Sequence, residues 1–167
     1  MQDTSNEIAF IGIGKMGLPM SLLIAKNGYS VTAYDRSATR LADARAQGVS
    51  VASSPADAVN GQSVVITSLP DDVALRAALL GSNGLLAAMA PNSVLIETST
   101  VSAEASAEVD AAASLGGIAY LRAPISGNAS IAHTGALTCF VSGPADTFNR
   151  VKPLRCRHLG QRRGRVI

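Results

Sequence analysis

The sequence predicts an α/β fold built on a doubly wound, mostly parallel sheet. Short apolar segments alternate with helix-compatible segments from Ile8 to Asp146, a pattern typical of parallel strands joined by crossover helices. A glycine-rich turn follows the first apolar segment, and an acidic residue follows the second. A chain of 167 residues is long enough for one domain with a substantial core.

The first unit is a strand, a glycine turn and a helix. Ile8–Ile11 is a short apolar strand, and the spacing Gly12-x-Gly14-x-x-Gly17 follows it directly. The first glycine permits a tight turn, the second lets a pyrophosphate approach, and the third lets helix pack on strand. Free N–H groups and the helix dipole then favour phosphate oxygens. This pattern predicts that the cofactor contacts Gly12, Ile13, Gly14, Lys15, Met16 and Gly17.

The second strand, expected over 30–34, ends at Asp35. A Rossmann-type fold places an acid about 20 residues after the glycines, where it accepts hydrogen bonds from the adenosine ribose. The alternative is an Asp that caps the next helix. With Arg36 as the next residue, the sequence does not decide between NAD and NADP, because an Arg here can pair with a 2′-phosphate. Asp35 favours NAD.

The remaining elements continue the alternation. Ser54, Asp71 or Asp72, and Ser102 are expected to begin helices, because each can accept a hydrogen bond from a free N–H of a first turn. The expected helices are 37–47, 54–59, 72–80 and 102–115, with a last one beginning at 143–146. The expected strands are 49–52, 63–68, 94–98, 118–121 and 137–142.

In such a sheet, ligands bind outside the carboxyl ends of the strands. The glycine turn and Asp35 lie at such ends, and so do three further loops of small or polar residues: 68–71, 98–101 and 123–128. Each loop taken alone is compatible with ordinary turn chemistry. Their shared edge favours a binding site.

The motifs resemble those of the β-hydroxyacid dehydrogenases, which include 3-hydroxyisobutyrate dehydrogenase, tartronate semialdehyde reductase and, more distantly, 6-phosphogluconate dehydrogenase. The stretch 12–20, GIGKMGLPM, is similar to the opening of the family. The segment 68–70 resembles its Leu-Pro segment beside the cofactor, and 97–100 its Asp-x-Ser-Thr stretch near the nicotinamide ribose. The resemblance implies that Leu69, Pro70 and Thr100 contact the cofactor.

A second pair of segments, 123–128 and 135–138, is similar to the family's substrate signature. The resemblance implies that Ser126, Gly127 and Asn128 bind the carboxylate of a small 3-hydroxy acid or semialdehyde. The alternative for Ser126 and Gly127 is a structural turn. Arg122 and Asn128 stand where the family has Asp and Gly, so the sequence does not identify the substrate.

The resemblance ends near Leu154, so residues 1–154 are expected to form an NAD(P)-binding Rossmann domain, and residues 155–167 an Arg/Gly-rich tail. The family's catalytic Lys and its C-terminal helical domain lie beyond this point, and Lys152, expected on an exposed helix face, does not match that Lys. No catalytic residue is assigned. Our hypothesis for the origin of this tail is a change of reading frame near Leu154; a genuine basic tail or a fragmentary gene are the alternatives.

The expected function is dinucleotide binding with little or no turnover, as the cofactor domain of a truncated oxidoreductase. The alternative is a non-catalytic dinucleotide-binding or dimerisation module. Without the helical domain, an exposed apolar surface is expected to make the chain a homo-oligomer or prone to aggregation.

The composition of the chain limits which classes of binding partner are expected. Five of the 14 basic residues lie in the last thirteen positions, so the first 154 residues carry 9 basic and 12 acidic side chains. This charge argues against nucleic acid. No apolar stretch approaches the roughly 20 residues of a membrane span, and the N-terminus is unlike a signal peptide, so a cytoplasmic protein without a membrane partner is expected. Cys139 and Cys156 have no metal-ligand spacing.

Overall fold

The computed structural model describes residues 6–158. Its main feature is a parallel sheet of six strands in the order β3-β2-β1-β4-β5-β6, which is the Rossmann order, with the direction of winding reversed between β1 and β4. This confirms the predicted fold class. The strands are β1 (Glu7–Ile11), β2 (Ser30–Tyr34), β3 (Ser50–Val51), β4 (Val64–Thr67), β5 (Val94–Glu97) and β6 (Ala119–Arg122).

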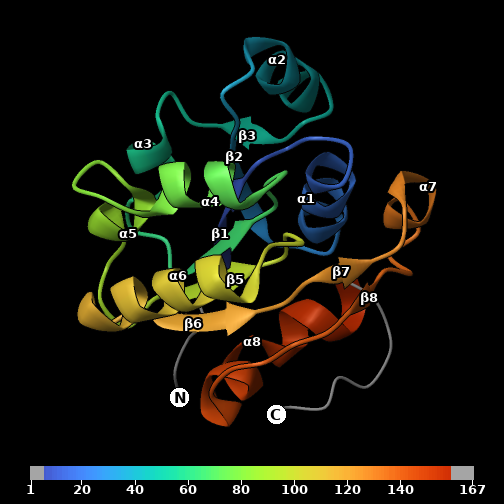
Figure 1. Cartoon of the computed structure of the whole chain (residues 1–167). Helices are drawn as coiled ribbons and strands as arrows, with labels where there is room; N and C mark the ends of the chain where they lie inside the picture. Colours follow the sequence, from blue (N-terminus) through green and yellow to red (C-terminus); the bar gives the residue numbers. More distant parts are fainter. Residues whose placement is uncertain (1–5, 159–167) are drawn as a thin grey trace.

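Helices cover both faces of the sheet (Figure 1). One face packs against α1 (Gly17–Lys26), α2 (Ala38–Ala46) and α8 (Ala145–His158). The other packs against α3 (Pro55–Val59), α4 (Asp72–Leu79), α5 (Leu85–Ala88) and α6 (Ala103–Leu115).

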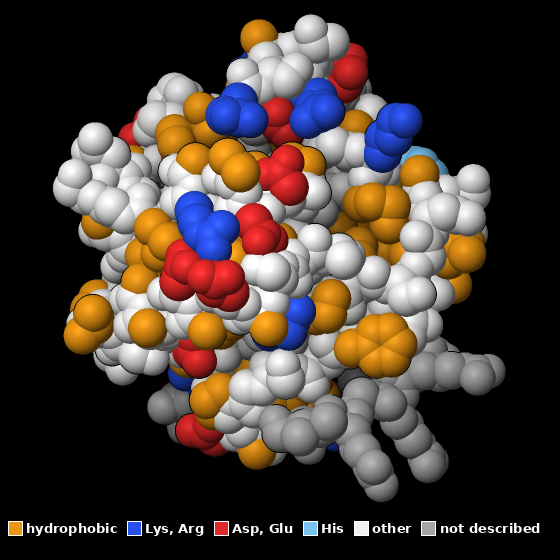
Figure 2. All heavy atoms as spheres, in the orientation of Figure 1, with side chains coloured by type: hydrophobic (Ala, Val, Ile, Leu, Met, Phe, Trp, Pro, Cys, Tyr) orange, Lys and Arg blue, Asp and Glu red, His pale blue; other side chains and the backbone are white. Residues whose placement is uncertain are grey.

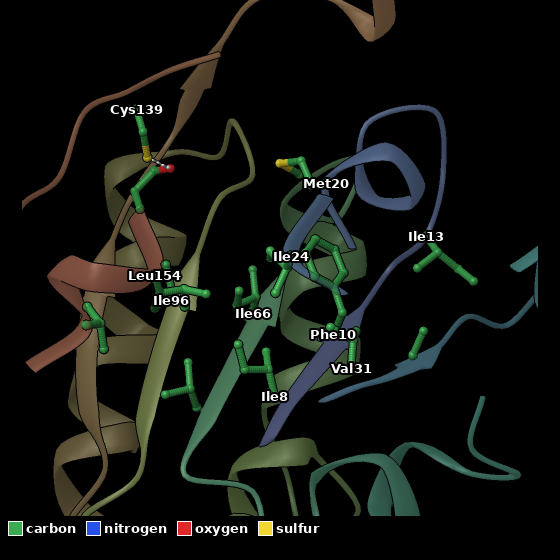
Figure 3. Close-up of a cluster of buried hydrophobic side chains, with 14 of the residues drawn as sticks. Ile8, Phe10, Ile13, Met20, Ile24, Val31, Ile66, Ile96, Cys139 and Leu154 are labelled. Carbon is green, nitrogen blue, oxygen red and sulfur yellow. Dashed lines mark hydrogen bonds between the residues drawn. The ribbon is translucent and has the colours of Figure 1, made fainter. Parts of the chain in front are cut away.

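Strand β1 shows why its apolar run is continuous. Ile8 and Phe10 belong to the cluster beneath α1, whereas Ala9 and Ile11 belong to the cluster beneath α3 to α6. Successive side chains of a strand point to opposite faces, so a strand covered on both sides needs an apolar residue at every position. Figure 3 shows Phe10 of β1 beside Ile24 of α1 in the first of these clusters.

The predicted helix starts at Ser54, Asp71 and Ser102 are confirmed by their hydrogen bonds. Their side-chain oxygens accept the N–H groups of Asp57, Ala74 and Ala105, at 3.1, 2.8 and 3.1 Å. Each pair is three residues apart, which is the spacing of an N-cap bond to the first helical turn.

The expected strand 137–142 is wrong in length. Only β8 (Thr138–Cys139) is a strand there, and it pairs antiparallel with β7 (Ile125–Ser126), which was expected to be part of a loop. One antiparallel bridge between Arg122 and Ser142 links this ribbon to the main sheet. The chain reverses through the one-turn helix α7 (Ala129–Ala132), and this connection is too short for the crossover that parallel pairing requires. Helix α5 was not expected from the sequence either.

Helix α8 runs past Leu154 to His158, so the change in composition at Leu154 does not coincide with the end of an element. Leu154 is only 3% exposed and packs in the cluster with Ile8 and Val151. Lys152 is exposed, as predicted. Residues 159–167 of the predicted tail lie outside the described residues.

Cys139 is a core residue, as a lone Cys in a strand predicted. It is 2% exposed, and its Sγ lies 3.1 Å from the Ala123 carbonyl oxygen (Figure 3). Within residues 6–158, no helix is both long and apolar enough to cross a membrane.

Candidate dinucleotide-binding site

The turn between β1 and α1 requires glycine at two positions. Gly12 has φ +88°, and a Cβ added there would overlap the Ser68 carbonyl oxygen at the end of β4. A Cβ on Gly17 would overlap the Gly12 carbonyl oxygen. Gly14 differs, because its added Cβ would meet only the Arg40 guanidinium, at 3.7 Å. The first and third glycines therefore allow close packing, and the second keeps the backbone open to a ligand.

The backbone of this turn has donors to offer. The Gly14 and Met16 carbonyls accept the N–H groups of Leu18 and Met20, but the N–H groups of Lys15 and Met16 donate to no described residue. They lie just before α1, a ten-residue helix. Unpaired N–H groups at a helix N-terminus favour an anion, and this chemistry fits the pyrophosphate of a dinucleotide.

Asp35 is buried at the end of β2 and is held by two backbone bonds. Its Oδ2 accepts the N–H of Ile13 at 3.0 Å, and its Oδ1 accepts the N–H of Ser37 at 2.8 Å. The N-cap of α2 is Ser37, whose Oγ accepts the N–H of Arg40. The capping role considered for Asp35 is therefore taken by Ser37. Asp35 instead ties the glycine turn to the start of α2.

Arg40 is the residue that the sequence analysis missed. Its Nη1 lies 3.4 Å from Asp35 Oδ2, and its guanidinium also faces Gly14. The signal was present in the sequence, because a helix capped at Ser37 places the residue three positions later in its first turn. The basic residue expected at this position was Arg36, the direct neighbour of Asp35.

These residues surround a cavity of about 470 Å³, a volume in the range of ligand pockets. Every predicted cofactor residue lines it except Ile13 and Thr100. The Ile13 side chain is buried in the core, and Thr100 is exposed. Residues that line the cavity but were not predicted come from the ends of β1, β2 and β4 and from helices α2 to α5: Ile11, Tyr34, Arg40, Pro55, Ser68, Ala74, Ala77, Ala78 and Leu85.

Basic side chains gather at this site. Lys15, Arg36 and Arg40 line the cavity, and Asp35 is the acidic residue among the lining residues. Figure 2 shows Lys and Arg side chains across the upper part of this face, over α2 and the beginning of α1. The local charge therefore suits an anionic ligand, although the first 154 residues carry more acidic than basic side chains.

A chain of hydrogen bonds positions the cavity wall at the end of β4. The N–H of Leu69 donates to Ser99 Oγ at 2.7 Å, and the N–H of Ser99 donates to Glu97 Oε1 at 2.7 Å. Thr98 Oγ1 donates to the Thr67 carbonyl oxygen at 2.7 Å. The segment 97–100 thus holds Leu69 and Pro70 in place from behind.

Glu97 supplies a prediction about pH. It is fully buried, and its Oε2 has no partner among the described residues. Burial raises its pKa, while the bonds from Ser99 and the charge of Arg122 act against that rise. The unfolded chain has the lower pKa, about 4.5, so the stability linked to this residue is complete below that pH and is lost as pH rises through the raised value.

We expect Glu97→Gln to be more stable than the wild type at pH 8 and to lose that advantage toward pH 4. The uncharged amide oxygen still accepts the Ser99 N–H. Each pH unit between the unfolded and folded pKa contributes about 1.4 kcal/mol. Urea unfolding between pH 4 and pH 8 measures the difference in free energy of unfolding between variant and wild type. The control is Glu104→Gln, because Glu104 is an exposed residue of α6. A constant difference at all pH values would contradict the prediction.

The predicted substrate residues lie apart from the cavity. All three residues are exposed and none lines the cavity: Ser126 ends β7, and Gly127 and Asn128 connect it to α7. Gly127 has φ +143°, and a Cβ there would press on Leu137 Cδ2 at 2.5 Å. Asn128 caps α7, because its Oδ1 accepts the Ile131 N–H at 3.1 Å. The Gly127 conformation fits the structural turn considered as the alternative for Ser126 and Gly127. Within residues 6–158, these residues do not meet the cofactor residues at the cavity.

Arg122, the other departure from the family pattern, makes contacts within the main sheet. It pairs with Glu97 in the register of β5 and β6. Its Nη2 donates to the Val101 carbonyl oxygen at 3.0 Å, while its Nε has no partner among the described residues.

The glycine turn, its unpaired N–H groups and the acid at the end of β2 agree with a match to known proteins. Residues 7–160 match the model of the NAD-binding domain of 6-phosphogluconate dehydrogenase. The chain belongs to this family. It is an α/β NAD(P)-binding domain of the oxidoreductase type, as predicted. The match continues to residue 160, beyond the boundary expected at Leu154.

Relatives with assigned activities are similar over most of the chain. An NAD-dependent L-serine dehydrogenase of Pseudomonas aeruginosa is 38% identical over 148 residues, which are 89% of this chain and 50% of that protein. The human mitochondrial 3-hydroxyisobutyrate dehydrogenase is 34% identical over 88% of this chain and 44% of its own length. The chain thus spans about half the length of the curated relatives it matches.

Solved structures agree. A 3-hydroxyisobutyrate dehydrogenase from Mycobacterium tuberculosis, determined with L-serine, has 35% identity and a TM-score of 0.87, over 96% of this chain and 53% of that one. The family predicted from the motifs is therefore confirmed. Within residues 6–158, no group of three His, Cys, Asp or Glu side chains could hold a metal ion.

Proposed function

We propose that this chain binds NAD or NADP in the cavity between the glycine turn and Asp35. The observation that carries the proposal is the pair of unpaired N–H groups of Lys15 and Met16 at the start of α1, next to a glycine that admits a ligand. In this assignment the pyrophosphate lies against the turn, and the adenosine lies toward Asp35. Leu69 and Pro70 face the same cavity and form its apolar wall.

We further propose that the whole protein is an oxidoreductase acting on a small 3-hydroxy acid or the corresponding semialdehyde. The names of the relatives support this class, because L-serine and 3-hydroxyisobutyrate are both carboxylic acids with a 3-hydroxyl group. The nicotinamide would exchange a hydride with the carbon that bears this hydroxyl. Chain residues would then bind the carboxylate and orient the hydroxyl.

For the carboxylate we propose Ser126, Gly127 and Asn128, on the resemblance of this segment to the substrate signature. Ser126 is exposed and has a hydroxyl to donate. Asn128 uses its Oδ1 to cap α7, which leaves its Nδ2 group as the donor for a substrate. A carboxylate accepts such bonds at both oxygens.

Acid or base catalysis is the step for which we assign no residue. The ionisable groups at the cavity are Lys15, Tyr34, Asp35, Arg36 and Arg40, and they lie on the side that we assign to adenosine and pyrophosphate. We therefore propose that the 167 residues bind the dinucleotide with little or no turnover.

Fluorescence titration with NADH and NADPH, together with steady-state assays on a panel of semialdehydes, tests both statements. We expect saturable binding of dinucleotide and turnover far below about 1 per second, the low end for ordinary enzymes. Absence of any dinucleotide binding would refute the proposed site. Turnover at an ordinary rate would refute the assignment of a binding role to this chain alone.

A further inference from the structure

Two charged side chains lie next to each other on one face of the sheet, at the end that carries the cavity. Glu97 ends β5 and Arg122 ends β6, and the two residues are register partners. Leu95 and Tyr120, each two positions earlier, pack in the cluster beneath α3 to α6, so Glu97 and Arg122 point to that face as well. Glu97 is fully buried. Burial of a charge is costly unless the group makes strong contacts, so the contacts of this pair indicate its role.

The pair holds the loop after β5 by two of its peptide groups. Glu97 Oε1 accepts the Ser99 N–H at 2.7 Å. Arg122 Nη2 donates to the Val101 carbonyl oxygen at 3.0 Å. Both bonds have a side chain of the charged type as one partner, and such bonds are stronger than neutral ones. The loop is therefore fixed on both sides of the exposed Thr100.

The same loop supports the wall of the cavity. Ser99 Oγ accepts the Leu69 N–H at 2.7 Å, and Ser99 is only 4% exposed, so this bond lies in a low-dielectric site where it is strengthened. Leu69 lines the cavity, and a Cβ added to Gly12 would lie 3.1 Å from Leu69 Cδ2. A shift of Leu69 would therefore change the space beside the glycine turn, where we place the pyrophosphate.

The start of α6 does not depend on this pair. Ser102 caps the helix by accepting the Ala105 N–H at 3.1 Å. The N–H of Ser102 donates in turn to Asp72 Oδ1, at the start of α4, at 2.9 Å. Because α6 has these anchors of its own, the contacts of Glu97 and Arg122 serve the loop that precedes it.

We propose that Glu97 and Arg122 are positioning residues for the dinucleotide: they fix the loop 98–101, and the Ser99 hydroxyl transmits this position to Leu69. Neither charged side chain lines the cavity, so the pair acts on affinity through the loop and not by contact with the ligand. This inference rests on the proposed dinucleotide site and extends it to two residues behind the cavity wall.

The test compares affinity for NADH with the free energy of unfolding, by fluorescence titration and urea unfolding of the 167-residue chain at pH 8. Ser99→Ala removes the acceptor of the Leu69 N–H. Ser106→Ala is the matched control, because Ser106 is also buried and its hydroxyl bonds to the Tyr120 hydroxyl at 2.8 Å. Neither Ser106 nor Tyr120 lines the cavity. Circular dichroism checks that each variant is folded.

Three further substitutions test the pair itself. Glu97→Ala removes the acceptor of the Ser99 N–H, whereas Glu97→Gln keeps an acceptor oxygen on a side chain of the same length. Arg122→Met removes the donor to Val101 and retains an unbranched apolar side chain. The double variant of Glu97→Ala with Ser99→Ala shows whether the two residues act in one chain of bonds. Arg122→Met replaces Glu97→Ala in the double variant if Glu97→Ala does not fold.

We expect Ser99→Ala, Glu97→Ala and Arg122→Met each to weaken NADH binding about 3- to 10-fold, the effect of losing one hydrogen bond. Ser106→Ala should lose stability as Ser99→Ala does, yet keep its affinity within about twofold of the wild type. Glu97→Gln should also keep its affinity, although its stability changes. The double variant should bind no more weakly than the weaker of its single variants, because both substitutions interrupt the same chain of bonds.

An unchanged affinity in Ser99→Ala would overturn the inference while leaving the dinucleotide site intact. An equal loss of affinity in Ser106→Ala would do the same, because it would show an effect of general destabilisation. So would an equal loss in Glu97→Gln and Glu97→Ala, which would make the charge, and not the position of the loop, the cause. A wild type that binds no NADH would instead refute the proposed function, and the positioning role with it.

Discussion

Gly17→Ala is expected to lower the free energy of unfolding by about 1–3 kcal/mol and to abolish dinucleotide binding. The added Cβ would overlap the Gly12 carbonyl oxygen and press on Phe10 Cε1 at 3.1 Å. A backbone carbonyl cannot move aside as a side chain does, so α1 must shift away from β1. That shift displaces the N–H groups of Lys15 and Met16. Urea unfolding and titration with NADH measure the two effects.

Gly14→Ala is the matched control, since it adds the same methyl group within the same turn. Its Cβ would meet only the Arg40 guanidinium, at 3.7 Å, and its φ is not positive. We expect its stability to stay within about 0.5 kcal/mol of the wild type, while dinucleotide binding weakens because the methyl group occupies the approach of the pyrophosphate. Equal losses of stability in the two variants would contradict the roles assigned to these glycines.

Phe10→Ala is expected to destabilise the protein by about 3–5 kcal/mol, enough to unfold a domain of ordinary stability. Phe10 is fully buried near the C-terminal end of β1, beneath α1 and beside the glycine turn (Figure 3). Removal of its ring leaves a cavity where the sheet supports the helix. Thermal and urea unfolding measure the loss, and dinucleotide affinity should fall with it.

Phe140→Ala provides the comparison for the same chemical change. Phe140 follows β8 and is 60% exposed, so its truncation removes little buried surface. We expect a change within about 0.5 kcal/mol. A loss for Phe140→Ala comparable with that for Phe10→Ala would mean that Phe140 is covered in solution, for example by another chain.

Much of the fold could be predicted, because its signals are local. A few neighbouring residues are enough to show each of these signals. They are the apolar runs of the six strands of the main sheet, the cap residues Ser54 and Ser102, and the end of a helix at Gly48. The ribbon of β7 and β8 could not be predicted in this way. Its antiparallel direction depends on the short connection through α7 between the two strands, and Ile125–Ser126 alone is too short to show a period.

Some residues of the candidate site could likewise be predicted from the sequence, and others could not. Gly12, Gly14, Gly17 and Asp35 could be named from spacing, since the strand–turn–helix unit is continuous in the sequence. Ile13 and Thr100 were expected at the cofactor, yet neither lines the cavity. Their motifs indicate which loop approaches the ligand, but not which way each side chain points.

The doubly wound parallel sheet, the glycine turn and the family could all be predicted from the amino-acid sequence, because periodicity and glycine spacing are properties of short segments. The contacts of Asp35, by contrast, depend on how distant segments pack together. Its carboxylate joins the N–H of Ile13, 22 positions away, to the N–H of Ser37, and it receives Arg40 from the surface. That contact exists because α2 packs where its first turn faces Gly14, and the packing of a helix depends on the whole core beneath it.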